Sequence, residues 1–310
     1  TSVGFDSLQA NTTGAENTAV GKDALFANTT GCQNTAVGLS SMFTNTTGCQ
    51  NVAMGRQSLH DNTTGKCNVA LGYNSLFNNE TADNNTAVGT HALFANTTGA
   101  NNAAVGKGSM GSNTTGSDNT AMGVEALVTA TTAASNAAFG RQAMCKTTTG
   151  ASNTAAGAFA LCANTTASNN TAVGKDSLKT NTTGTENVAV GSGALDSNTT
   201  AGCNTSIGHG SMGDNTEGAN NVAVGRNALG SNTTGNSNVA VGRGALVLNT
   251  TATGNTGLGM NSLTANTTGA NNVGVGWQAL TSNTTASNNT AVGTLALSAN
   301  TTGTCNTAVG

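Results

Sequence analysis

The chain has 310 residues, of which 42 are glycine, none is proline, 7% are charged and 3% are aromatic, and its formal net charge is −3. An ordinary globular domain is about 25% charged, and a disordered segment usually carries high net charge with little apolar pattern, so the composition excludes both. The sparse charge provides no basic patch for nucleic acid or membrane lipid, and no apolar run is long enough to span a bilayer.

A unit of seventeen residues repeats along the whole chain without insertion or deletion. Counted from its asparagine, the first position is Asn in all 18 copies from Asn17 onward, and the fifth is Gly in all 19 from Gly4 onward. The ninth is Leu or Met in all 18 copies from Leu8 onward. Short, strict periods are typical of solenoids, whose units pack on their neighbours. We therefore expect residues 1–310 to form one continuous array, cut from a longer chain.

The second to fourth positions predict a short strand, because they hold β-branched and small residues such as Thr18-Ala19-Val20. The glycine at the fifth position closes this strand. Its invariance indicates a backbone with positive φ or a corner too tight for a Cβ atom. We therefore predict structural turns at Gly21, Gly38, Gly55, Gly72 and Gly89.

The fourth and ninth positions supply most of the large apolar side chains and are the predicted core: Val20, Leu25, Val37, Met42, Leu59 and Leu93. Burying two such side chains per unit gives roughly 3 to 6 kcal/mol, which is less than the cost of ordering seventeen residues. A single unit is therefore not expected to fold alone. Either a compact coil of small residues or association of several chains would compensate, and we favour association, as a homotrimer or an end-to-end filament.

The abundance of Gly, Thr and Asn argues against helices, and no 3.6-residue apolar pattern is present. The predicted fold is all-β, a parallel β-solenoid (β-roll) of about eighteen 17-residue rungs. Stacking at about 4.8 Å would place identical residues in columns. The Asn columns could then exchange amide hydrogen bonds, and the Thr columns could pair hydroxyl and methyl groups.

The twelfth to fourteenth positions mostly read Asn-Thr-Thr, a second β-favouring segment and an acceptor sequence for N-glycans. Three interpretations are open: a structural ladder, an N- or O-glycan coat, or a threonine array that orders water or ice. A glycan on every rung would be crowded at a spacing of about 4.8 Å. The candidate glycosylation residues are Asn28, Thr29, Thr30, Asn45, Thr46, Thr47, Asn62, Asn96, Asn113, Asn164, Asn181, Asn198, Asn232, Asn249, Asn266, Asn283 and Asn300.

Two pairs of cysteines fall at equal positions of successive units, and stacking would bring each pair within disulfide range. The candidate disulfides are Cys32 with Cys49 and Cys145 with Cys162. Disulfides would indicate an oxidising, extracellular setting. The alternative is that all seven cysteines are small buried thiols. Cys67, Cys203 and Cys305 have no neighbour in register and are expected to be free or intermolecular.

Catalysis has little support in the sequence. The three histidines occupy three different positions of the unit, and no nucleophile motif or cysteine–histidine metal motif is present. We expect no enzyme activity, metal or cofactor. The sixth position holds seven of the ten basic residues, for example Lys22, Arg56 and Arg226, and is read as a solvated turn or a ligand-contacting edge.

The segments Asn17 to Gly21, N-T-A-V-G, and Asn187 to Gly191, N-V-A-V-G, resemble repeats in the head domains of trimeric autotransporter adhesins. The whole unit also resembles N-T-A-x-G…A-L…N-T-T-G repeats of phage tail fibres and bacterial surface proteins. The resemblance implies a left-handed, trimeric β-roll outside the cell that serves in attachment. The expected function is a structural extracellular fibre or adhesin shaft at the cell or virion surface. A glycan coat and a surface receptor are further expectations. An ice-binding threonine array and a viral tail-fibre shaft are the alternatives.

Overall fold

A computed structural model describes residues 1–310 as two compact units, Thr1–Asn153 and Thr154–Gly310, built from the same rung. The first unit contains β1 (Ser2–Val3), β2 (Thr18–Val20), β3 (Thr35–Val37), β4 (Val52–Met54), β5 (Val69–Leu71), β6 (Thr86–Val88), β7 (Ala103–Val105), β8 (Thr120–Met122) and β9 (Ala137–Phe139). The second contains β10 (Thr154–Ala156), β11 (Thr171–Val173), β12 (Val188–Val190), β13 (Thr205–Ile207), β14 (Val222–Val224), β15 (Val239–Val241), β16 (Thr256–Leu258), β17 (Val273–Val275), β18 (Thr290–Val292) and β19 (Thr307–Val309).

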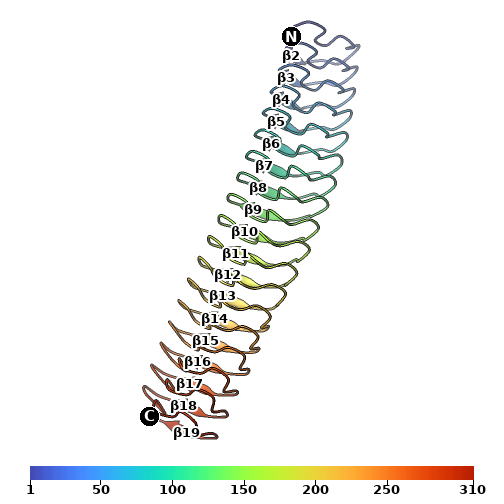
Figure 1. Cartoon of the computed structure of the whole chain (residues 1–310). Helices are drawn as coiled ribbons and strands as arrows, with labels where there is room; N and C mark the ends of the chain where they lie inside the picture. The colour runs from blue at the N-terminus through green and yellow to red at the C-terminus, as the bar shows by residue number, and fades with distance from the viewer. The chain divides into compact units, whose positions relative to one another are not determined.

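Within each unit every strand pairs in parallel with the strand of the next rung, at an offset of one repeat. Thr18 lies beside Thr35, for example, and Ala19 beside Ala36. Figure 1 shows the rungs of the first unit, in blue to green, lying one on another in chain order. The predicted parallel β-solenoid is therefore confirmed. That residues 1–310 form one uninterrupted array stays a prediction.

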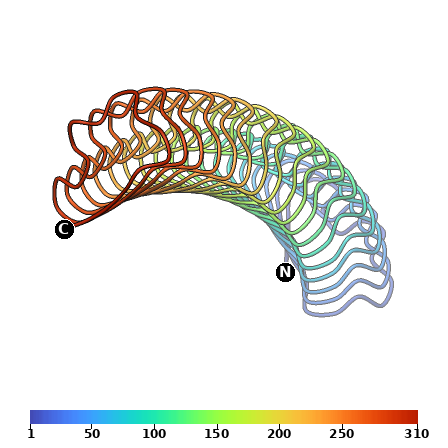
Figure 2. The ribbon, with the colours of Figure 1, turned by 90° about the horizontal axis from the view of Figure 1, so that it is seen from below.

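Backbone hydrogen bonds between rungs continue outside the strands. The amide of Leu25 donates to the carbonyl of Ser41 at 3.0 Å, and the amide of Thr29 donates to that of Thr46 at 3.0 Å. The view in Figure 2 shows the same loops repeated from rung to rung within each unit. The whole rung, and not only its three-residue strand, is held by its neighbours.

The glycine at the fifth position has the predicted backbone. The φ values of Gly21, Gly38, Gly55, Gly72 and Gly89 lie between +129° and +137°. A Cβ atom on Gly55 would lie 2.5 Å from the carbonyl oxygen of Gly72. Both the turn and the close contact between rungs therefore require glycine.

Three further positions of the rung have left-handed backbone without being glycine. In the first complete rung they are Asp23, Leu25 and Gln33, with φ of 58°, 51° and 57°. A left-handed non-glycine residue costs roughly 1 to 2 kcal/mol, and a leucine rarely adopts this conformation. The side chain of Leu25 is completely buried, so the burial of a large apolar group offsets this cost.

The core prediction is confirmed at the ninth position and is wrong at the fourth. Leu25, Met42, Leu59 and Leu93 are fully buried, as are the alanines at the third position. Val20, in contrast, is 37% exposed, and Val37 is half-buried. Side chains alternate across a strand, so inward-pointing Ala19 forces both of its neighbours to the outside. The core therefore consists mainly of leucine, methionine, alanine and asparagine side chains.

Candidate functional site

The asparagine of the Asn-Thr-Thr segment is a core residue. Asn45 is fully buried, and its Nδ2 donates to Oδ1 of Asn28 at 2.8 Å and to the carbonyl of Gly48 at 3.1 Å. Asn62 repeats this pattern on Asn45. The result is a ladder of amides in which each asparagine donates to the asparagine of the preceding rung and to a carbonyl of its own rung.

This ladder corrects the prediction of N-glycans. A glycan would replace an Nδ2 hydrogen that already donates, on a nitrogen with no access to solvent. Twelve of the predicted acceptors are fully buried: Asn28, Asn45, Asn62, Asn96, Asn113, Asn164, Asn181, Asn198, Asn232, Asn249, Asn266 and Asn283. Asn300 is half-buried, and its Nδ2 donates to Asn283 and Gly303.

A second ladder runs through the first position of the rung. The backbone amide of Asn34 donates to Oδ1 of Asn17 at 3.0 Å, and Nδ2 of Asn34 donates to the carbonyl of Gly48 at 2.8 Å. Asparagine in a sequence usually indicates a turn, so its burial in two columns could not be predicted from residue type. The only hint in the sequence is that the first position is always asparagine.

The ladder of the twelfth position is interrupted on two successive rungs of the first unit, which have Ala130 and Thr147 in place of asparagine. Asn113 donates to Asn96 at 2.8 Å, but its own Oδ1 is buried without a partner. The next rung has Ala130, so the amide donor for this oxygen is missing.

We therefore expect Ala130→Asn to stabilise the first unit by about 1 to 3 kcal/mol, the cost of an unpaired buried acceptor. The test is the free energy of unfolding of the full chain in denaturant, compared with Thr132→Asn on the exposed side of the same rung. Equal effects of the two substitutions would show that the oxygen is satisfied in solution.

The two threonines of the segment differ in their environment. Thr29 and Thr46 are half-buried, and the hydroxyl of Thr29 donates to the carbonyl of Thr46 at 3.1 Å. The second threonines, Thr30 and Thr47, are exposed. One hydroxyl column is thus used by the fold and one faces solvent.

The cysteines divide into two groups. Cys145 and Cys162 are disulfide-bonded, which agrees with the prediction for these two residues. Cys32 and Cys49 are free thiols with their sulfur atoms 2.9 Å apart, so the predicted disulfide is not formed in this structure. A disulfide requires an S–S distance of about 2.05 Å. The hydrogen bond with Cys49 is the main cause that raises the pKa of the Cys32 thiol.

We expect oxidised glutathione to convert the thiols of Cys32 and Cys49 into a disulfide, releasing two equivalents of reduced glutathione per bond. Their sulfur atoms are already adjacent, so little backbone movement is needed. Peptide mass spectrometry after oxidation should find a Cys32–Cys49 crosslink ahead of any crosslink that involves exposed Cys67. Preferential modification of Cys67 would contradict this order.

An aromatic column occupies the tenth position of the first unit. The rings of Phe26, Phe43, His60, Phe77 and Phe94 stack on successive rungs, with centroids 4.8 to 5.5 Å apart. Nδ1 of His60 also lies 2.6 Å from a carboxylate oxygen of Asp61. The rings cover one another, and so the column adds to the cohesion between rungs.

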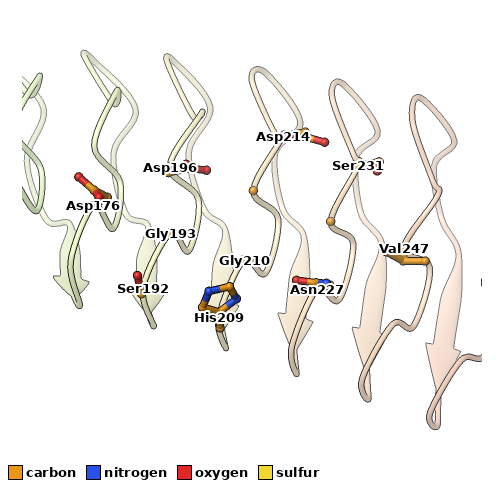
Figure 3. Close-up of a pocket in the computed structure, with 12 residues that line it drawn as sticks. Asp176, Ser192, Gly193, Asp196, His209, Gly210, Asp214, Asn227, Ser231 and Val247 are labelled. Carbon is orange, nitrogen blue, oxygen red and sulfur yellow. The ribbon is translucent and has the colours of Figure 1, made fainter.

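A groove in the surface lies in the second unit, where glycines replace side chains at the seventh and tenth positions (Figure 3). This open groove of about 440 Å³ is lined by Asp176, Ser192, Gly193, Asp196, His209, Gly210, Gly213, Asp214, Asn227, Gly230, Ser231 and Val247. Asp176 forms ion pairs with Lys175 and Lys179, at 3.6 and 3.2 Å. Burial, and then the negative charges of Asp214 and Asp176, raise the pKa of Asp196.

A carboxyl whose pKa is raised by folding stabilises the fold when protonated and loses that contribution as the pH rises through its folded pKa. We therefore expect Asp196→Asn to raise the melting temperature at pH 7 and to have a smaller effect at pH 3. Asp118→Asn, at an exposed site of the first unit, is the control. An equal shift at both pH values would contradict a titrating carboxyl.

The basic residues of the sixth position are exposed to solvent. The side chains of Lys22 and Lys175 are 60% and 69% exposed, and each lies within 3.7 Å of the aspartate that follows it. No group of three or more histidine, cysteine or acidic side chains is arranged to bind a metal ion. No helix has the length and apolar character of a membrane span.

Comparisons with known proteins leave the family open. No known protein-family profile matches the chain, and no curated protein matches it significantly. The resemblance to adhesin heads and tail fibres therefore stays a prediction.

Proposed function

We propose that this chain is a segment of an extracellular structural fibre or adhesin shaft, at a cell or virion surface, without enzyme activity. The observation that carries the proposal is that the polar groups of each rung form hydrogen bonds to the next rung. Backbone amides, asparagine amides and threonine hydroxyls all bond to the next rung, as in the bonds from Thr29 and Asn45. A body held in this way can gain length by adding rungs.

The solvent-exposed threonines also fit a structural fibre. The second threonines of the Asn-Thr-Thr segments, such as Thr30 and Thr47, are exposed and could carry O-glycans, whereas the buried asparagines could not. Disulfide-bonded Cys145 and Cys162 favour an oxidising compartment outside the cell. Self-association of several chains and binding to a surface receptor are part of this proposal.

The test is whether inserting rungs lengthens the molecule. Duplicating residues 17–84 inserts four whole rungs and should increase the maximum dimension in small-angle X-ray scattering by roughly 19 Å at constant cross-section. The control duplicates residues 17–80, which breaks the period, and should lose the β-structure signal in circular dichroism. An unchanged dimension in the first variant would overturn the proposal.

A further inference from the structure

The outward side chains of β2–β9 form one surface, which we call the outer strand face of the first unit. At the fourth position all of these residues are apolar, and Val20, Met54, Met122 and Phe139 are 37%, 45%, 45% and 39% exposed. At the second position they are Thr, Val or Ala and half-buried. Not one charged residue interrupts the face across its eight strands.

This face is as large as the apolar surface patches that are often functional. An apolar side chain of this size presents roughly 100 Å² when free, so sixteen residues at about one-third exposure present roughly 500 Å². The largest apolar patch of a typical monomer is about 300 to 600 Å² and is often functional. Two such faces in contact would bury on the order of 1,000 Å², the size at which specific interfaces begin.

We propose that the outer strand face of the first unit binds the same face of a second copy of this chain, as a two-fold symmetric dimer. A neutral face of short parallel strands is complementary to itself, because two copies meet without like charges and with the same spacing between rungs. A charged partner would lose solvation on this face without gaining an ion pair.

The geometry also favours an assembly of two chains over one of three. One face is fully used by one partner, whereas three chains around an axis would need two contact faces on each chain. The proposal rests on the proposed fibre function and deepens it, because it names which surface joins the chains and replaces the predicted homotrimer by a pair.

The experiment measures the mass of the full chain by sedimentation equilibrium between 1 and 100 µM. The wild type should be a dimer that dissociates on dilution. The triple variant Val88→Lys, Val105→Lys and Met122→Lys should raise the dissociation constant at least about a hundredfold, since six lysines would be buried unpaired. The milder set Val88→Thr, Val105→Thr and Met122→Thr should raise it about tenfold while keeping the strands, where threonine is already common.

The control places the same charges elsewhere. Thr98→Lys, Thr115→Lys and Thr132→Lys lie on the exposed turn of the same three rungs and should leave the dimer intact. Circular dichroism of each variant separates loss of the dimer from loss of the fold. A monomeric wild type at 100 µM, a trimer, or a dimer that tolerates both face variants would overturn the proposal.

Two other results would separate the dimer from the proposed fibre function. Thermal hysteresis from a monomeric wild type would favour the water-ordering function and would overturn the dimer. A stable dimer whose length does not grow with added rungs would contradict the fibre function but leave the interface in place.

Discussion

Gly55→Ala is expected to destabilise the first unit by at least about 4 kcal/mol. Gly55 has a φ of +137°, which side-chain-bearing residues avoid at a cost of about 1 to 3 kcal/mol. The added Cβ would also lie 2.5 Å from the carbonyl oxygen and 2.7 Å from the carbonyl carbon of Gly72. Neither rung can move away without breaking the backbone bonds on both sides. The measurement is the free energy of unfolding in denaturant, combined with hydrogen exchange over residues 38–89.

Gly48→Ala is the matched control. A Cβ at Gly48 would be as close to its neighbours, at 2.4 Å from Oδ1 of Asn45. Alanine nevertheless occupies this fifteenth position in other rungs, for example at Ala82 and Ala133, and its backbone is not left-handed. A loss below about 1 kcal/mol is expected. Similar losses for Gly48→Ala and Gly55→Ala would show that crowding, and not the backbone conformation, requires glycine at the fifth position.

Asn62→Ala is expected to destabilise the first unit by about 2 to 4 kcal/mol. Nδ2 of Asn62 donates to Asn45 at 2.8 Å and to the carbonyl of Gly65 at 3.0 Å, and its Oδ1 accepts from Asn79 at 3.0 Å. Truncation leaves buried polar atoms on both neighbouring rungs unpaired, each at a cost of about 1 to 3 kcal/mol. Urea unfolding of the full chain measures the loss.

Thr64→Ala, two residues later on the exposed turn, is the comparison and should change stability by less than about 0.5 kcal/mol. The natural Ala130 and Thr147 show that an interruption of the ladder on two rungs is tolerated in an otherwise complete stack. If Asn62→Ala were as mild as Thr64→Ala, the asparagine column would be a consequence of the fold and not a cause of its stability.

The period and the invariant glycines were sufficient to predict the fold, because a solenoid makes the same demand on the same position in every rung. The glycine prediction at Gly21 succeeded for this reason. The core prediction failed at Val20 because a three-residue strand has no long alternation that would show which side faces inward. The rung buries Ala19 completely and leaves Val20 37% exposed.

The two asparagine columns and the left-handed leucines were beyond sequence reasoning for a different reason. Asparagine is usually exposed, and Asn28 is buried only because Asn11 and Asn45 lie on either side of it. Leu25 has positive φ because its side chain must enter the core from a tight turn. Both features depend on stacking, and a single rung does not contain that information. The groove around Asp196 likewise follows from glycines on neighbouring rungs.

High-resolution cryo-electron microscopy of the native material directly tests whether the chain forms a fibre with a buried asparagine ladder. We expect continuous filaments of 17-residue rungs, with Asn28 and Asn45 buried in an amide ladder free of sugar. Any glycan density would then lie on the exposed threonine column that includes Thr30. Sugar density on the asparagine column, or a short discrete particle in place of a filament, would contradict it.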